Sequence, residues 1–155
     1  MRQMAAICLL ALVLGAPARA QDARTWIFNF DSDTAVLQFG TPESDDAVLV
    51  IACEPGKKSM HINEFIGADG LVPGRTAHLK LTNGVTSVDY AGQTVANEMD
   101  GTVNVEVTMA PDAKLIALLK TGTALTVNIA GKQTSIPLTG AAPHVAEFEK
   151  ACLRR

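Results

Sequence analysis

The sequence predicts a mainly β fold, either an antiparallel β-sandwich or a partly open barrel of about nine strands, with two short helices in its C-terminal half. Turn-forming residues, chiefly Gly, Asn, Asp and Pro, interrupt the chain about every ten residues. Between them run short segments in which apolar and polar residues alternate, as in half-buried strands. Apolar residues at helical spacing near 112–120 and 143–152 predict the two helices.

Residues 1–20 have the features of a cleaved signal peptide. Arg2 supplies a positive start, an apolar run extends from Ala5 to Leu14, and Ala18–Ala20 is a small-x-small cleavage signature. We therefore predict that residues 21–155 form a single β-rich domain that is periplasmic or secreted. No later stretch approaches the roughly 18 apolar residues of a membrane helix, so we predict a chain that does not span the membrane.

The first predicted hairpin carries most of the aromatic side chains. Trp26, Phe28 and Phe30 alternate with polar or aliphatic residues along one strand, and Phe39 lies on the returning strand. The whole sequence contains only 5 Phe, 1 Trp and 1 Tyr. We therefore expect these four aromatic residues to supply much of the core.

The run from Ala47 to Cys53 is apolar on both faces, and we expect it to lie at the centre of the sheet with cover on each face. Cys53 ends this run, and Cys152 is the other cysteine that remains once Cys8 leaves with the signal peptide. Because exported proteins fold in an oxidising compartment, we predict a disulfide between Cys53 and Cys152. The alternative is a pair of unbonded buried thiols.

The C-terminal helix is the predicted cover for this central strand. Val145, Phe148 and Cys152 are spaced three and four residues apart and therefore share one helical face. A disulfide from Cys152 would hold that face on the strand. We therefore expect Val145 and Phe148 to pack near Leu49 and Ile51.

The strand after the central one loses its register. Met60 and Ile62 fall on one face, whereas Phe65 falls on the other. A β-bulge near Asn63 or Glu64 would bring the three side chains into agreement, and we expect one there.

A meander follows, with turns expected at Asn83–Gly84, Ala91–Gly92 and Asp100–Gly101. The strand from Thr102 to Met109 alternates cleanly and predicts one buried face. Pro111 is expected just inside the start of the first helix, where its missing N–H is not needed. Two further strands between the helices complete the predicted sheet.

Five acidic residues fall in two loops that are adjacent in the sequence, and carboxylates are ligands for Ca²⁺. Their spacing matches no calcium-binding loop, and Asp and Glu are common in solvated turns. We therefore favour turns over a metal site for the following residues: Asp31, Asp33, Glu43, Asp45 and Asp46.

Histidine and serine patterns also lack a specific chemical signature. His61, His78 and His144 include no pair at helical metal-ligand spacing. There is no Gly-x-Ser-x-Gly motif and no free cysteine beside a suitable histidine. We predict no catalytic residue, no metal, no cofactor and no enzymatic activity.

The charge balance argues against nucleic acid as a partner. The sequence has 13 basic and 16 acidic residues, a net charge of −3. Loss of Arg2 and Arg19 with the signal peptide would lower the net charge to −5. Because Lys and Arg form no cluster, we expect neither nucleic acid nor an anionic membrane surface to bind.

Several stretches of the sequence resemble those of a known group of proteins. These are the run Phe39–Asp46, the apolar strand that ends at Cys53, and the tail that contains Ile136–Gly140 and Ala151–Cys152. They are similar to small exported proteins of alphaproteobacteria, and the C-terminal third resembles invasion-associated locus B proteins. The resemblance implies a Gram-negative periplasm, a β-rich fold and a role in the cell envelope, and it implies no catalytic residue.

The predicted function is a non-enzymatic periplasmic module that binds another protein or an envelope component. An alternative of a different class is an inhibitor of a foreign hydrolase, which would insert a protruding loop into a cleft. The connection from Gly67 to Arg75 is the candidate for that loop. A third hypothesis is a hydrolase that uses the loop carboxylates.

Overall fold

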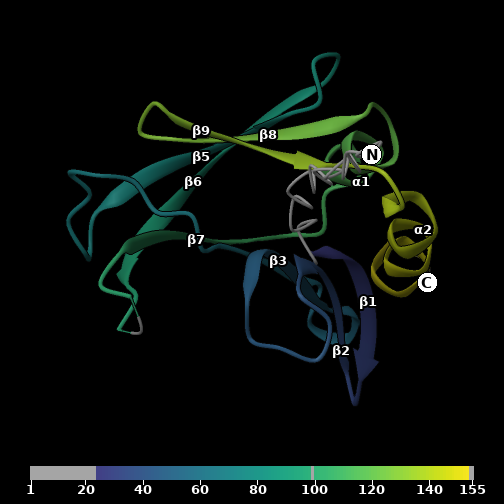
Figure 1. The fold of residues 1–155 in the computed structure, drawn as a ribbon. Coiled ribbons are helices and arrows are strands. Elements are labelled where there is room, and N and C mark those ends of the chain that lie inside the picture. The colour runs from purple at the N-terminus through teal and green to yellow at the C-terminus, as the bar shows by residue number, and fades with distance from the viewer. Residues whose placement is uncertain (1–23, 99, 154–155) are drawn as a thin grey trace, which may run out of the picture.

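The computed structural model describes residues 24–98 and 100–153, and the predicted signal peptide lies outside them. The described residues form nine antiparallel strands and two α-helices (Figure 1). The strands are β1 (Thr25–Asp31), β2 (Thr34–Gly40), β3 (Ala47–Glu54), β4 (Ser59–Glu64), β5 (Thr76–Thr82), β6 (Ser87–Ala96), β7 (Val103–Met109), β8 (Ala124–Ile129) and β9 (Lys132–Pro137). The helices are α1 (Ala113–Lys120) and α2 (Ala141–Leu153), and a 3-10 turn, η1 (Pro55–Lys57), follows β3.

All nine strands belong to one sheet in the order β1-β2-β3-β4-β7-β6-β5-β8-β9. The sheet is not closed by strand pairing, but its two edge strands approach each other. The indole N–H of Trp26 in β1 donates a hydrogen bond to the carbonyl oxygen of Pro137 in β9, at 2.7 Å. The mainly β prediction with about nine strands and two later helices is confirmed, and the single unclosed sheet is the arrangement observed.

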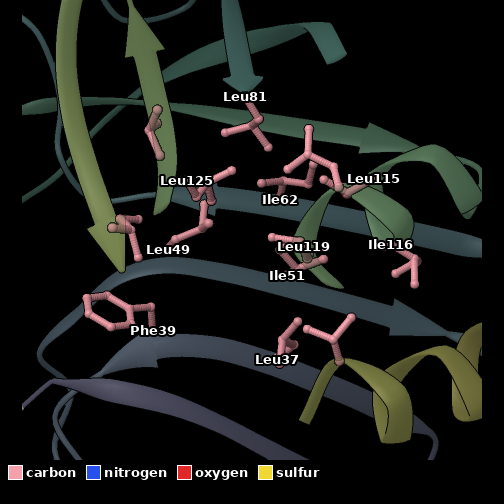
Figure 2. Close-up of a cluster of buried hydrophobic side chains, with 14 of the residues drawn as sticks. Leu37, Phe39, Leu49, Ile51, Ile62, Leu81, Leu115, Ile116, Leu119 and Leu125 are labelled. Carbon is pink, nitrogen blue, oxygen red and sulfur yellow. The ribbon is translucent and has the colours of Figure 1, made fainter. Parts of the chain in front are cut away.

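The core lies between the inner face of this curved sheet and the two helices. Figure 2 shows part of the cluster, with leucine and isoleucine side chains from several strands and from α1. Both helices bury an apolar stripe here because their leucine, valine and phenylalanine residues recur at three- and four-residue spacing. The fully or almost fully buried helix residues are Leu115, Ile116, Leu118, Leu119, Ala141, Val145 and Phe148.

The expectation that β3 has cover on both faces is wrong. Leu49, Ile51 and Cys53 are fully buried, whereas Val48 and the other residues of the opposite face are only half-buried. A strand in the interior of a sheet has neighbours on both edges, but here only one face of that sheet meets a core. The apolar residues of the outer face are therefore partly open to solvent.

Helix α2 packs on the same inner face and is held there by a covalent link. The structure places Cys53 and Cys152 at disulfide distance, with Cα atoms 6.0 Å apart. Val145 and Phe148 are fully buried in the same cluster as the inner residues of β3. The contacts of α2 with the sheet are nevertheless mainly with β1 and β2, and α2 lies beside β1 in Figure 1. The expectation that α2 packs mainly on β3 is therefore wrong, because α2 packs mainly on β1 and β2.

The aromatic hairpin enters the core at only one end. Trp26 and Phe39 are buried, and their ring centroids lie 5.6 Å apart. Phe28 is partly buried, whereas Phe30, next to the β1–β2 turn, is 55% exposed. Burial falls along β1 because Trp26, at its start, lies against Pro137 of β9, whereas Phe30 lies at the other end of the strand. The prediction that Phe30 belongs to the core is wrong.

The predicted turn at Ala91–Gly92 is also wrong, because β6 runs through both residues. A Cβ atom added to Gly92 would lie 2.5 Å from the backbone oxygen of Glu106 on β7. This glycine therefore allows the backbones of two strands to approach closely, which is the other common reason for glycine inside a strand.

Gly92→Ala is therefore expected to lower the free energy of unfolding by about 1–3 kcal/mol, as overpacked sites do. Gly56→Ala is the control, because a Cβ there would meet no atom within 4 Å. Urea unfolding of both variants measures the difference. Equal stability of the two variants would contradict this explanation for Gly92.

The hairpin at Asn83–Gly84 is present, but its loop is longer than the two residues predicted, because β6 starts only at Ser87. The side-chain amide nitrogen of Asn83 donates to the carbonyl oxygens of Leu118 and Thr121, at 3.0 Å each. The loop thus supplies a hydrogen-bond donor at the C-terminal end of α1, where Leu118 also accepts the backbone N–H of Thr121 at 3.4 Å. The prediction that Pro111 lies just inside the start of α1 is wrong, because Asp112 is the N-cap and Pro111 precedes it.

Candidate functional site

Three loops meet at one end of the molecule, next to the ends of β4 and β7. They are residues 41–46, residues 65–75, and residues 97–98 with 100–102. Residues from all three loops, or directly beside them, line two surface hollows of about 450 and 260 Å³. We call residues 65–75 the anchored loop, because both of its ends are fixed by buried polar side chains.

The first anchor is Glu64, the last residue of β4, whose side chain is fully buried. Its Oε2 accepts hydrogen bonds from the backbone N–H groups of Ile66 (2.8 Å) and Gly67 (2.9 Å). Its Oε1 accepts one from Val105 N–H on β7, at 2.6 Å. Burial raises the pKa of Glu64, although these three donors and the charge of Lys132 oppose the rise. One carboxylate therefore joins the start of the loop to a neighbouring strand.

Glu64 also explains why the predicted bulge is absent. The pairing of β4 with β3 continues without a break to Glu64, which follows Met60 and Ile62 on the inner face. The sequence pattern loses its apolar period because a carboxylate occupies the third inward position. The strand then ends, and Phe65 lies on the other face. The register shift that the sheet does contain lies between Phe39 and Gly40.

The second anchor is Thr94 on β6, which is also buried. Its hydroxyl oxygen accepts a hydrogen bond from Arg75 N–H at 2.8 Å, and it lies 2.6 Å from the carbonyl oxygen of Val72. The backbone adds a hydrogen bond from Gly74 N–H to the Thr94 carbonyl oxygen, at 2.7 Å. The end of the loop is therefore held as firmly as its start.

Across residues 24–98 and 100–153, the buried polar side chains are those of Glu64, Thr94 and Asn104. Asn104 Oδ1 lies 3.1 Å from the Thr102 hydroxyl oxygen, which is also 2.7 Å from Asp100 Oδ1, and Thr102 lies directly against Gly67. All three buried polar groups thus support this one region. Burial of a polar group is unfavourable unless it is hydrogen-bonded, so the region is specifically stabilised.

The anchored loop nevertheless displays apolar side chains to solvent. Val72 is 58% exposed and Phe65 is 41% exposed. Apolar groups that are exposed on an ordered backbone can be buried on binding with little loss of backbone entropy. The sequence singled out the connection from Gly67 to Arg75 as a candidate loop, but it did not identify the anchors, because a single glutamate at the end of a strand has no motif. The interruption of the apolar period at Glu64 was the available signal.

Replacement of Glu64 tests directly whether its carboxylate holds the start of the anchored loop to β7. Glu64→Ala leaves three N–H donors without their carboxylate, so we expect the free energy of unfolding to fall by about 1–3 kcal/mol. Amide hydrogen exchange at Gly67 and Val105 should accelerate more than exchange in β1 and β2. The control is Glu106→Ala, at an exposed position on β7. Unchanged exchange at Gly67 would contradict the role assigned to Glu64.

The acidic residues predicted for neighbouring loops do not converge. Asp31 and Asp33 flank the β1–β2 turn, whereas Glu43, Asp45 and Asp46 follow the far end of β2. A strand of this length separates its two ends by about 20 Å. Loops that are adjacent in sequence therefore lie at opposite ends of the hairpin.

The histidines are also dispersed, although His61 lies in a polar cluster. Its Nε2 is 3.1 Å from the Ser59 hydroxyl oxygen, and its Nδ1 is 3.0 Å from that of Thr108. In a serine–histidine–acid triad the carboxylate bonds Nδ1, but here Glu54 lies 3.8 Å from Nε2 instead. The arrangement therefore lacks the geometry of that triad. Within the described part of the chain, His, Cys, Asp and Glu side chains form no group of three suited to a metal ion.

The fold and this surface define a small single-sheet β domain that displays an anchored loop. Comparison with known proteins found no matching protein-family model, curated protein or solved structure. In the part of the chain that the structure describes, neither helix is long and apolar enough to cross a membrane.

Proposed function

We propose that this protein is a non-enzymatic interaction module of the cell envelope, exported to the periplasm or secreted, and that it binds a protein partner through the anchored loop. The observation that carries the proposal is the position of the three buried polar side chains of the described residues, Glu64, Thr94 and Asn104. Each of these buried polar groups stabilises the exposed connection or the loop beside it.

A protein gains affinity when its contact surface is already ordered before binding, because less conformational entropy is lost on association. The anchored loop meets this condition, and its exposed Val72 offers apolar area for burial in an interface. The resemblance to exported alphaproteobacterial proteins, and with it the envelope role, remains a prediction that is consistent with this proposal.

Capture from cell extracts with matched variants tests the proposal. The chain with Val72→Glu is expected to lose a specific partner that the unchanged chain retains. Val85→Glu is the control, because Val85 is 92% exposed and lies on the β5–β6 loop instead. A partner that survives Val72→Glu but is lost with Val85→Glu would show that the loop is not the binding element.

An inhibitor of a foreign hydrolase is the second candidate, and the anchored loop is the observation that favours it. An inhibitory loop must enter a cleft without collapsing, and hydrogen bonds at both of its ends would hold it in shape. This candidate predicts that the captured partner is a hydrolase whose activity falls in proportion to the amount of this protein added. A captured partner without hydrolytic activity would exclude it.

A further inference from the structure

We propose that the larger hollow beside the anchored loop, which Phe65 and three aspartates line together, binds an arginine or lysine side chain of the protein partner. This inference rests on the proposed function and names the partner's chemistry at the same surface. The hollow, here the acidic hollow, has a volume of about 450 Å³. It is lined by Arg24, Asp45, Asp46, Ala47, Val48, Phe65, Asn97 and Asp100.

The lining of the acidic hollow includes one aromatic and two aliphatic side chains, those of Phe65, Ala47 and Val48. Phe65 is 41% exposed, and its backbone N–H donates to the carbonyl oxygen of Val48 at 2.9 Å, which fixes the backbone of Phe65 next to β3. Val48 belongs to the half-buried outer face of that strand. Such a surface accommodates the aliphatic part of a long cationic side chain, and the face of a phenylalanine ring attracts the cationic end.

The charges around the ring favour a cation. Three aspartates line the hollow together with one arginine, so their net formal charge is −2. Hydrogen bonds from Arg24 lower the pKa of Asp46, and hydrogen bonds from Thr102 lower the pKa of Asp100. Both carboxyl groups are therefore ionised at neutral pH, and the negative charge of the whole chain adds to their attraction for a basic segment.

The protein's own Arg24 shows how a guanidinium group fits this surface. Its Nε and Nη2 atoms each lie 3.2 Å from a different carboxylate oxygen of Asp46, which is a bidentate arrangement. Asp45 and Asp100 supply two further carboxylates beside Phe65. A second cationic side chain is therefore the occupant whose charge complements the hollow.

A short peptide tests the site independently of the unknown partner. The purified exported protein is titrated with acetyl-Gly-Arg-Arg-Gly-amide, and amide NMR shifts are followed. The control peptide carries citrulline at both arginine positions, which has a similar shape but no charge. We expect shifts at Val48, Phe65 and Asp100 with the arginine peptide, binding about tenfold weaker or worse with citrulline, and weaker binding at high salt.

Matched variants separate this site from general attraction to an acidic protein. Phe65→Leu and Asp45→Asn should each weaken the arginine peptide by about two- to fivefold. Phe30→Leu and Asp33→Asn are the controls, because they alter an exposed phenylalanine and an aspartate in another loop. Equal binding of the citrulline peptide, or equal losses in the control variants, would overturn the proposal.

Failure of the acidic hollow as a cation site can be distinguished from failure of the proposed function. If the partner depends on Val72 but the arginine peptide does not bind at Phe65, the interaction module stands and the acidic hollow does not. If the peptide binds as expected but no partner depends on Val72, the hollow is a cation site and the role of the anchored loop fails.

Discussion

Replacement of both Cys53 and Cys152 with alanine should lower the free energy of unfolding by about 4–5 kcal/mol. The two residues are 99 positions apart, and a cross-link that closes a loop of this length restricts the unfolded chain strongly. Chemical denaturation of the oxidised protein and the double variant measures the change. A loss below about 1 kcal/mol would contradict the entropic account of this bridge.

The same bridge should protect one element more than the others. Cys53 lies in a sheet that keeps its hydrogen-bonded strands after reduction, whereas Cys152 lies in the last turn of α2. Reduction should therefore accelerate amide hydrogen exchange in α2 before it does so in β2 or β3. Equal protection of α2 with and without the bridge would show that packing alone holds the helix.

Phe148→Ala should lower the free energy of unfolding by about 3–5 kcal/mol, because it removes a fully buried aromatic ring from the contact of α2 with the sheet. Phe30→Ala is the matched control. Phe30 is 55% exposed, so its removal should change stability by about 0.5 kcal/mol or less. Equal effects of the two substitutions would show that the core is not where the structure places it.

Much of the fold could be predicted from the sequence because strands and turns are local features. The alternation of apolar residues in β7 and the helical spacing in α2 depend only on each segment's own residues. The disulfide could be predicted because only two cysteines follow the predicted signal peptide. These features require no knowledge of which strand lies beside which.

The errors arise where a distant partner decides the role of a residue. The sequence around Gly92 predicts a turn, and only the position of β7 against it explains the glycine. Glu64 interrupts the apolar pattern of a strand, and only the surrounding N–H donors of Ile66, Gly67 and Val105 explain the glutamate. The connection from Gly67 to Arg75 could be singled out as a candidate loop, but its anchors and the acidic hollow could not, since they come from segments that are far apart in the sequence.

Site-specific photo-crosslinking in the living cell tests the central claim most directly. A photoreactive residue replaces Val72 in one strain and Val85 in another, because both valines are exposed but only Val72 lies on the anchored loop. The account predicts one discrete crosslinked protein at position 72 that is absent at position 85. A crosslink at position 85 with none at position 72 would contradict it.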